Sequence, residues 1–492
     1  MTKLATLTCC SSFVLGCYSP NVPIGDISTD ASGTSGSSDP SAGTTTESSS
    51  PSQPSSGGSR SADADTSEDS TTAATACGNG VVEPDEACDD GRQNGSYSAC
   101  RDDCTGLGSH CGDGEIDPQF EICDDGNSDQ GDGCNIDCLE SGALLWELRL
   151  PTGLSYGGCG GLAVTENSEV VISTNGTEPR VVKVSSAGEE VWDVGLTLSN
   201  ATADDVAVAP NGDALAIAYE GSTVSISRWS SDGAAIWARE YENSTANGYP
   251  DFGRGIASDA DGNVIAVGAR SQAQGNVSHD IFLRRYSAEG DVFWTRILAD
   301  TQVDEYANSA SISIVGGFYV ACGAMSDGAG GRMPWVGAIS YENSLVWAHL
   351  DAAAEYGDEY FDVAVAADGS IAVAGVTDPG GDAAISVARL SPDGDDEWAR
   401  TVDNFDGVDE RGMGVAISSD GTVLVAGSTS GGWLGKFSAD GETLLWTATQ
   451  ADAEDGFADV EVDSADNVFV CGARPSSENP ALNDVWVAKF TP

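Results

Sequence analysis

Positive charge is scarce in this chain. Its 492 residues include 21 Lys and Arg and 3 His against 78 Asp and Glu, a formal net charge of −57 at pH 7. Such a surface repels phosphates and anionic lipid headgroups and attracts cations and basic partners. The composition therefore argues against nucleic-acid binding. Acidity that keeps a secreted protein soluble, or that suits a salty medium, is the simpler explanation and stays open beside cation or partner binding.

Long apolar runs are also missing. The weakly apolar N-terminal stretch that ends at Gly16 is too short to span a bilayer as a mature helix. No later run approaches the roughly eighteen apolar residues of a membrane-spanning helix. We therefore expect the chain after this stretch to be soluble and to touch a membrane through an anchor only.

Motifs of activated catalytic groups are absent from the sequence. It has no H-E-x-x-H, no P-loop and no dinucleotide fingerprint. The histidines are isolated from one another in the sequence, at His110, His279 and His349. Carboxylate pairs are too frequent in so acidic a chain to identify an acid–base pair. We predict that the protein is not an enzyme and needs no cofactor, with a hydrolase as the less favoured alternative.

Cysteine, in contrast, is plentiful, with 14 residues in three groups. The first group lies at the N-terminus, where Val14-Leu15-Gly16-Cys17 resembles the lipobox of bacterial lipoproteins. That resemblance implies a signal peptide over residues 1–16 and acylation of Cys17, by more than one chain because a single chain anchors only marginally. An ordinary signal peptide cut elsewhere is the alternative. The resemblance predicts a lipid-anchored protein of the cell envelope, at the outer membrane and exposed on the surface.

A Ser-, Thr- and Gly-rich linker follows the lipidated residue and runs to residue 76. It has almost nothing to bury, so we predict a disordered tether. About fifty residues of coil have an r.m.s. span on the order of 40 Å, which lets the folded part stand off the membrane.

The second cysteine group forms two tandem units over residues 77–140. Both begin C-G-[ND]-G, contain C-D-D-G and end in C-x₃-C; their cysteines are Cys77, Cys88, Cys100 and Cys104, then Cys111, Cys123, Cys134 and Cys138. They resemble the myxobacterial cysteine-rich disulfide repeat, which implies a non-catalytic surface module. A unit this small needs bridges to fold, and export favours disulfides over zinc. Spacing leaves the connectivity open.

Acidic turns in these units are candidate calcium ligands, because Ca²⁺ prefers oxygen ligands on tight turns. Asp and Gly also simply favour turns, and the spacing does not match an EF-hand. The candidates are Asp89, Asp90, Asp124, Asp125, Asn127, Asp129 and Asp132.

From residue 143 to 492 the sequence repeats every 45–57 residues, and each repeat closes on a tryptophan. These are Trp146, Trp192, Trp237, Trp294, Trp347, Trp398 and Trp446. Each repeat has four alternating apolar runs separated by turn residues, such as Asp261-Gly262, which predicts four antiparallel strands and hence the blade of an all-β propeller. The segment 143–150 looks like a fourth strand without the first three, and 485–492 like a third strand without a fourth. We predict that they pair and close a ring of seven blades.

The spacing G-x₃-W, as in Gly188/Trp192, resembles the repeat of pyrroloquinoline-quinone-type propellers. That resemblance implies a tryptophan packed between neighbouring blades. Quinone enzymes of this type have eight blades, so seven blades argue against their activity. A basic residue recurs five positions before the turn glycine, and we interpret it as a structural surface pair whose stem covers the sheet. These residues are Lys183, Arg228, Arg285, Arg389 and Lys436, with Lys489 at the end.

Three single cysteines lie in the repeats. Cys322 and Cys471 occupy one second-strand position in the fourth and seventh repeats, and buried free thiols are the default. A bridge between Cys159 and Cys471 across the ring closure is the alternative.

Loops from the fourth strand of one blade to the first of the next are acidic and aromatic. We predict that they form a binding face for an unknown protein or polysaccharide, with candidate residues Tyr356, Asp358, Glu359, Tyr360, Phe405 and Asp409. A non-enzymatic binding protein is therefore the favoured function. An assembly scaffold of the outer-membrane envelope is the alternative.

Overall fold

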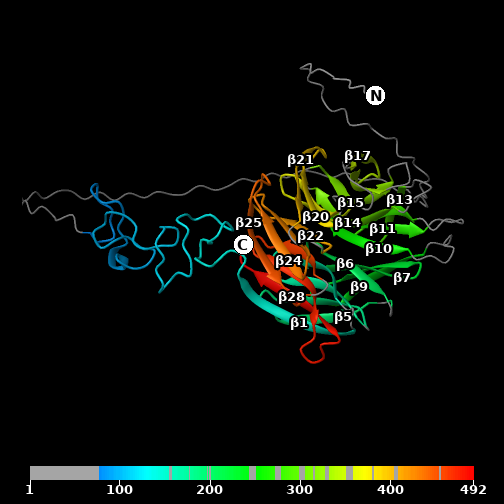
Figure 1. The fold of residues 1–492 in the computed structure, drawn as a ribbon, viewed down its shortest axis with the longest axis horizontal. Coiled ribbons are helices and arrows are strands. Elements are labelled where there is room, and N and C mark those ends of the chain that lie inside the picture. The colour runs from blue at the N-terminus through cyan, green and yellow to red at the C-terminus, as the bar shows by residue number, and fades with distance from the viewer. Residues whose placement is uncertain are drawn as a thin grey trace, which may run out of the picture.

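Seven four-stranded antiparallel sheets stand around a common axis (Figure 1). The computed structural model describes residues 77–492 except 155–157, 177, 197, 199–200, 243–250, 272–278, 299–304, 314–315, 327–331, 351–357, 379–381, 404–407 and 454–455. The predicted seven-bladed β-propeller is confirmed, preceded by a cysteine-rich segment with a short 3₁₀ helix, η1 (Gly91–Gln93). That segment lies to one side of the propeller, near the C-terminus (Figure 1).

The blades are numbered along the chain, and their strands are given from the axis outward. Blades 1 to 3 contain β2 (Gly158–Val164), β3 (Val170–Asn175), β4 (Arg180–Val184) and β5 (Glu190–Gly195); β6 (Thr202–Val208), β7 (Ala214–Glu220), β8 (Thr223–Trp229) and β9 (Ala235–Glu242); β10 (Phe252–Ser258), β11 (Val264–Ser271), β12 (His279–Tyr286) and β13 (Val292–Leu298). Blades 4 to 6 contain β14 (Tyr306–Ser313), β15 (Phe318–Ser326), β16 (Arg332–Ser340) and β17 (Leu345–Leu350); β18 (Glu359–Val365), β19 (Ile371–Thr377), β20 (Ala384–Leu390) and β21 (Asp396–Val402); β22 (Arg411–Ile417), β23 (Val423–Ser428), β24 (Gly432–Phe437) and β25 (Leu444–Gln450).

Blade 7 is built from both ends of the repeat region. It contains β26 (Phe457–Val462), β27 (Val468–Pro475), β28 (Asn483–Phe490) and, as its outer strand, β1 (Leu144–Leu154). β1 runs antiparallel to β28, with Leu148 opposite Val487. The closure predicted from the incomplete terminal repeats is therefore confirmed, and it pairs an edge that would otherwise be exposed.

The repeated tryptophans fill the seams between blades at the circumference. Six of the seven lie against the turn before the outer strand of the next blade, as Trp146 lies against Gly188 and Trp192 against Gly233. Five of the seven indole Nε1–H groups donate to a carbonyl of that turn, at 2.8–3.1 Å. The glycine and tryptophan of one G-x₃-W motif therefore serve two different seams.

The seventh seam has no turn of its own, because β1 and β28 are not joined by a hairpin. Gly142, which precedes β1, takes the place of the turn glycine and lies against Trp446 with φ +70°. Its N–H donates to the Pro492 carbonyl at 3.3 Å, and Thr491 Oγ1 donates to the Glu140 carbonyl at 2.6 Å. The end of the cysteine-rich segment is thus part of the ring.

The recurring basic residues are structural, as predicted, but they are not on the surface. Arg228, 5% exposed, pairs with Asp213 and donates to the carbonyls of Gly262 and Ala288 in the next blade. Lys183 likewise reaches the Ser231 carbonyl of the next blade, at 3.2 Å. These side chains cross the seams beside the tryptophans, because their long stems span the gap while turn carbonyls satisfy the charged heads.

A disulfide joins Cys159 of β2 to Cys471 of β27 and links blade 1 to blade 7 across the closure. The default of free thiols is therefore wrong for these two residues, and the alternative is the one observed. Cys322 is a buried free thiol, as expected.

The glycines Gly188 and Gly212 offer a matched test of the seam. Both have positive φ, 82° and 80°, so alanine costs on the order of 1–2 kcal/mol of backbone strain at either site. A Cβ at Gly188 would also lie 2.7 Å from Trp146 Cδ2, whereas at Gly212 the nearest atom is 3.5 Å away. We expect Gly188→Ala to lower the free energy of unfolding by roughly 1–3 kcal/mol more than Gly212→Ala in chemical denaturation. Equal losses would contradict a role for the tryptophan contact.

Candidate functional site

Two of the residues predicted to form the binding face are buried. Asp358 is 2% exposed, and its carboxylate accepts from Thr377 Oγ1 at 3.0 Å and from the Asp378 N–H at 2.8 Å. Tyr360 is equally buried, in the core between blades 4 and 5. These two side chains are therefore parts of the interior, contrary to the prediction that they contact a partner.

The other candidates on this face differ in position. Glu359 Oε1 accepts from Asn308 Nδ2 of the neighbouring inner strand at 2.6 Å. Asp409 is exposed and accepts from the Ala383 N–H at 3.3 Å. Tyr356 and Phe405 lie outside the described residues. The described part of this face brings together no group of accessible aromatic and acidic side chains.

A different group of carboxylates surrounds the propeller axis. Every inner strand has a bulge, and the residue after it is Asp205, Asp362 or Asp459 in three blades. Each of these carboxylates accepts a backbone N–H from the inner strand of the next blade, donated by Ile256, Val415 and Leu162 respectively, at 2.7–2.8 Å. We call these three interactions the axial clasp.

Each inner strand that donates to the clasp also lies close to the blade that follows it. The donor N–H in each case follows a glycine, which is Gly255, Gly414 or Gly161. A Cβ on Gly414 would lie 2.7 Å from Asp459 Cα, and one on Gly161 would lie 2.5 Å from Asp205 Oδ1. Glycine is therefore needed at these positions because a neighbouring blade occupies the space of the side chain.

Two residues after the position of the clasp carboxylates, the inner strands carry mostly small side chains. These leave a cavity of about 860 Å³ on the axis. That position holds alanine in five blades, Ser311 in blade 4 and Glu461 in blade 7. The lining extends from the clasp carboxylates to the hairpin turns between first and second strands, where Glu166 and Asn211 are exposed. The cavity thus opens on the face of the propeller opposite the predicted loop face.

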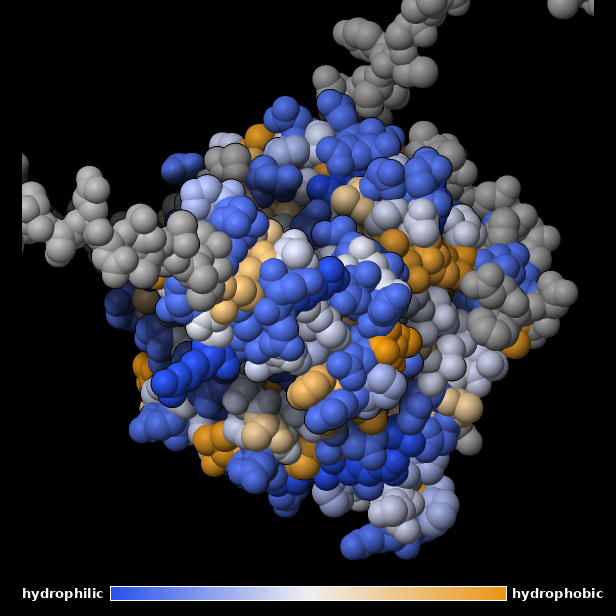
Figure 2. Space-filling model, turned by 90° about the vertical axis from the view of Figure 1, so that its left-hand side faces the viewer, coloured by the Kyte–Doolittle hydropathy of each residue, from blue (hydrophilic) through white to orange (hydrophobic). Residues whose placement is uncertain are grey.

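The cysteine-rich segment joins the propeller on the same face as the cavity mouth. Gly131 lies against Lys436 and Pro492, at the ends of third strands of blades 6 and 7. Figure 2, which views the molecule from the side of this segment, shows a mostly hydrophilic surface with separate apolar patches.

Burial dominates the electrostatics of the axial carboxylates. It raises the pKa of Asp205, Asp362 and Asp459, although backbone N–H groups oppose the shift. Burial, and after it the negative charge of Asp362, raises the pKa of Glu461 to about 8. Glu461 is therefore largely protonated at neutral pH and can donate a proton or ionise when a cation approaches.

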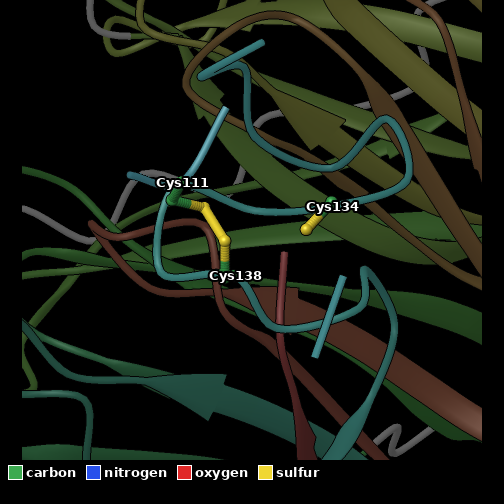
Figure 3. A group of neighbouring side chains, drawn as sticks. All are labelled: Cys111, Cys134 and Cys138. Carbon is green, nitrogen blue, oxygen red and sulfur yellow. A yellow bond between two sulfur atoms is a disulfide. The ribbon is translucent and has the colours of Figure 1, made fainter. Parts of the chain in front are cut away.

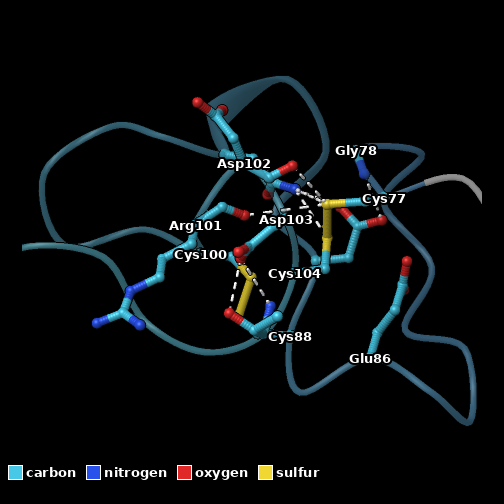
Figure 4. Close-up of a disulfide and its surroundings, with 12 residues drawn as sticks. Cys77, Gly78, Glu86, Cys88, Cys100, Arg101, Asp102, Asp103 and Cys104 are labelled. Atoms are coloured by element: carbon cyan, nitrogen blue, oxygen red, sulfur yellow. Dashed lines mark hydrogen bonds between the residues drawn. A yellow bond between two sulfur atoms is a disulfide. The ribbon is translucent and has the colours of Figure 1, made fainter.

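All eight cysteines of the two small units form disulfides, as predicted. The pairing is nested within each unit: Cys77–Cys104 around Cys88–Cys100, then Cys111–Cys138 around Cys123–Cys134. Figure 4 shows both bridges of the first unit. In Figure 3 the sulfurs of Cys111 and Cys138 are bonded and the Cys134 sulfur lies apart from them. Among the described residues, four sets of acidic and cysteine side chains are close enough together to hold a metal ion. Three sets include such cysteines, whose bonded sulfurs are not metal-binding thiolates, and the fourth is Glu83, Glu86 and Asp89.

The predicted calcium ligands have hydrogen-bond partners in the protein. Asp124 accepts the N–H groups of Gly112, Asp113, Gly114 and Gly126 at 2.8–3.1 Å, and these N–H groups lower its pKa against the effect of burial. Asp89 has the equivalent role in the first unit.

The remaining candidates are also engaged. Asp90 and Asp125 accept the N–H of Cys100 and Cys134, and Asn127 donates to Asp132 at 3.2 Å. Asn127 Oδ1 in turn accepts the Asp129 N–H. Calcium binding stays a prediction, and the structure gives these residues the role of holding tight turns.

The chain matches no protein-family model and no curated protein. Similar solved structures include a protein of unknown function from Bacteroides caccae (15% identity, TM-score 0.38, 53% of this chain and 86% of that chain) and BamB from Moraxella catarrhalis (14%, 0.38, 67% and 85%). The β-propeller domain of Cps50 (Swd1) from Myceliophteria thermophila is a third (11%, 0.45, 71% and 99%). Similarities this low carry no argument about function. Within the described residues, no helix is long and apolar enough to cross a membrane.

The raised pKa of Glu461 predicts a pH dependence of stability. The protonated form is favoured in the folded chain, so its contribution is complete below the ordinary pKa of 4.5 and is lost as pH rises through about 8. Glutamine cannot ionise, so Glu461→Gln removes this loss. We expect the variant to gain on the order of a few kcal/mol over the wild type between pH 5 and pH 9, in denaturation experiments. The exposed Glu190→Gln should follow the wild type, and a Glu461→Gln curve parallel to wild type would refute the assignment.

Proposed function

We propose that this chain is an exported, non-enzymatic binding protein whose axial cavity takes a cationic group of a partner. The observation that carries the proposal is the cavity, in which four carboxyl groups from three blades meet on the axis. Three of them hold the blades together, whereas Glu461 replaces an alanine in a ring of small residues. Its carboxyl group therefore serves a purpose other than the common architecture of the blades.

A basic side chain of a partner protein is the ligand that fits best. Glu461 ionises more readily when a positive charge lies beside it, and the low dielectric of the cavity strengthens that attraction. A lysine or arginine also supplies donors for carboxylate oxygens, and such charge-assisted hydrogen bonds are stronger than neutral ones. The net charge of −57 favours the approach of a basic partner from a distance.

The envelope location is part of the proposal. Cys17 and the linker to residue 76 lie outside the described residues, so its support is the lipobox-like sequence and five disulfides, which need an oxidising compartment. A tether on the outer surface would present the propeller to partners outside the cell.

Binding of short peptides tests the cavity. We expect arginine- and lysine-containing tripeptides to bind in a salt-sensitive manner, and glutamate-containing ones not to bind. Glu461→Gln should weaken binding about tenfold, the loss of one charge-assisted contact. Ala364→Leu, which narrows the cavity without altering charge, should also weaken it. Glu190→Gln is the control. If calorimetry shows undiminished affinity in both cavity variants, the axial cavity is not the binding site.

Anchoring and exposure can be tested in cells. Cys17→Ser removes the acylated thiol, so we expect the protein to move from the membrane fraction to the soluble fraction. Protease added to intact cells should cleave the wild-type protein if it is on the surface. A protected protein would favour the alternative of an assembly scaffold inside the envelope, and a Cys17→Ser protein that stays with membranes would contradict lipid anchoring.

A further inference from the structure

The cysteine-rich segment exposes apolar side chains out of proportion to its size. Of fifteen large apolar residues that are strongly exposed in the described part of the chain, seven lie between residues 77 and 140. These are Val81, Val82, Leu107, Ile116, Phe120, Ile122 and Ile136, at 51–65% exposure. Where such residues form contiguous apolar surface bordered by polar residues, that surface marks an interaction site in soluble proteins.

The loop 116–122 of the second unit buries its acid and exposes its apolar residues. Glu121 is 5% exposed, and its Oε2 accepts the Asp117 N–H at 2.6 Å. The N–H groups of Phe120 and Glu121 both donate to the Asp117 carbonyl, so the loop is a closed turn around that carboxylate. Ile116, Phe120 and Ile122 consequently lie outside, at 54%, 52% and 65% exposure.

The exposed loop is continuous with the first unit. The Phe120 ring stacks on Tyr97 of that unit, with ring centres 4.6 Å apart and planes 21° from parallel. We call Tyr97, Ile116, Phe120 and Ile122 the module patch. It joins the two units and is held by rigid, disulfide-bonded turns, so a partner binds it without ordering a flexible segment.

Most of the exposed large apolar residues of the propeller, in contrast, have a place in its repeat. Val191, Ile236, Phe293 and Val346 each precede a seam tryptophan. Phe293 covers the guanidinium of Arg285, with the carbon 4.7 Å from the ring centre. Shielding of a seam cation accounts for this position, whereas nothing in the turn architecture of the small units requires isoleucine or phenylalanine on the outside.

Charge selects the partner of the module patch. Residues 77–140 contain 17 Asp and Glu and only two basic residues, Arg92 and Arg101. A second copy of this chain would bring two such surfaces together and be repelled, and so would an anionic membrane. A protein segment with apolar side chains flanked by lysine or arginine satisfies both features of the surface.

We propose that the paired cysteine-rich units bind a basic amphipathic protein segment through the module patch. This site lies outside the propeller and does not depend on the axial cavity. The apolar side chains of the partner cover Phe120 and Ile122, and its basic side chains pair with the surrounding carboxylates.

The test uses the full chain with Cys17→Ser and two peptides of equal charge, one of alternating lysine and leucine and one of alternating lysine and serine. We expect the leucine peptide to bind at least about tenfold more tightly in fluorescence anisotropy. The variant Ile116→Ser/Phe120→Ser/Ile122→Ser should lose that preference and bind both peptides alike. The control Val191→Ser/Ile236→Ser/Val346→Ser removes as many exposed apolar side chains from the propeller and should retain it.

Several outcomes would contradict the proposal, and each can be told from the others. A preference unchanged in the patch variant, or lost equally in the control, would overturn the proposal. So would a dimer in sedimentation that the patch variant abolishes, because the occupant would then be a second copy. Mass spectrometry of unreduced protein checks that the disulfides are intact. Glu461→Gln should leave the leucine preference in place, which separates this site from the axial cavity.

Discussion

The structure depends on a hydrogen bond that crosses from one inner strand to the next at the propeller axis. Asp205, Asp362 and Asp459 each accept a backbone N–H from the neighbouring blade, and the residue before each donor is a glycine because the blade that follows lies so close to it. Burying three carboxylates near one another is costly, and the N–H donors offset only part of that cost. We interpret the clasp as fixing the spacing of the blades. Its carboxyl groups also line the cavity beside it.

At the circumference, a different set of contacts joins each blade to the next around the whole ring. Tryptophans and long basic side chains reach the turns of the next blade, and Gly142 completes the seam that has no turn of its own. The disulfide Cys159–Cys471 and the pairing of β1 with β28 secure the junction of first and last repeats. Because Gly142 directly follows the cysteine-rich units, these units are attached at the face where the cavity opens.

The blades were predictable because their signal is local and repeated. Alternating apolar runs, Asp-Gly turns and a closing tryptophan specify four strands wherever they occur, and the incomplete terminal repeats specify the closure. The nested disulfides were not predictable, because four cysteines can pair in three ways and their spacing in the sequence is compatible with all three. The axial carboxylates were missed because they are four among 78 acidic residues. Aligning the inner strands would have found Glu461, which stands where five other blades have alanine. Asp358 and Tyr360 were assigned to a loop, but Asp358 directly precedes β18, Tyr360 lies in this strand, and both side chains are buried.

The central claim is that ligand binds on the axis and not on the loops of the opposite face. The alanines that line the cavity, Ala163, Ala207, Ala257, Ala364 and Ala416, are natural reporters of it. Methyl NMR of alanine-labelled protein during titration with an arginine tripeptide measures the claim directly. The account predicts that these methyl resonances shift together, saturably, and that Glu461→Gln suppresses the shifts. Resonances that stay fixed while methyl groups elsewhere shift would contradict it.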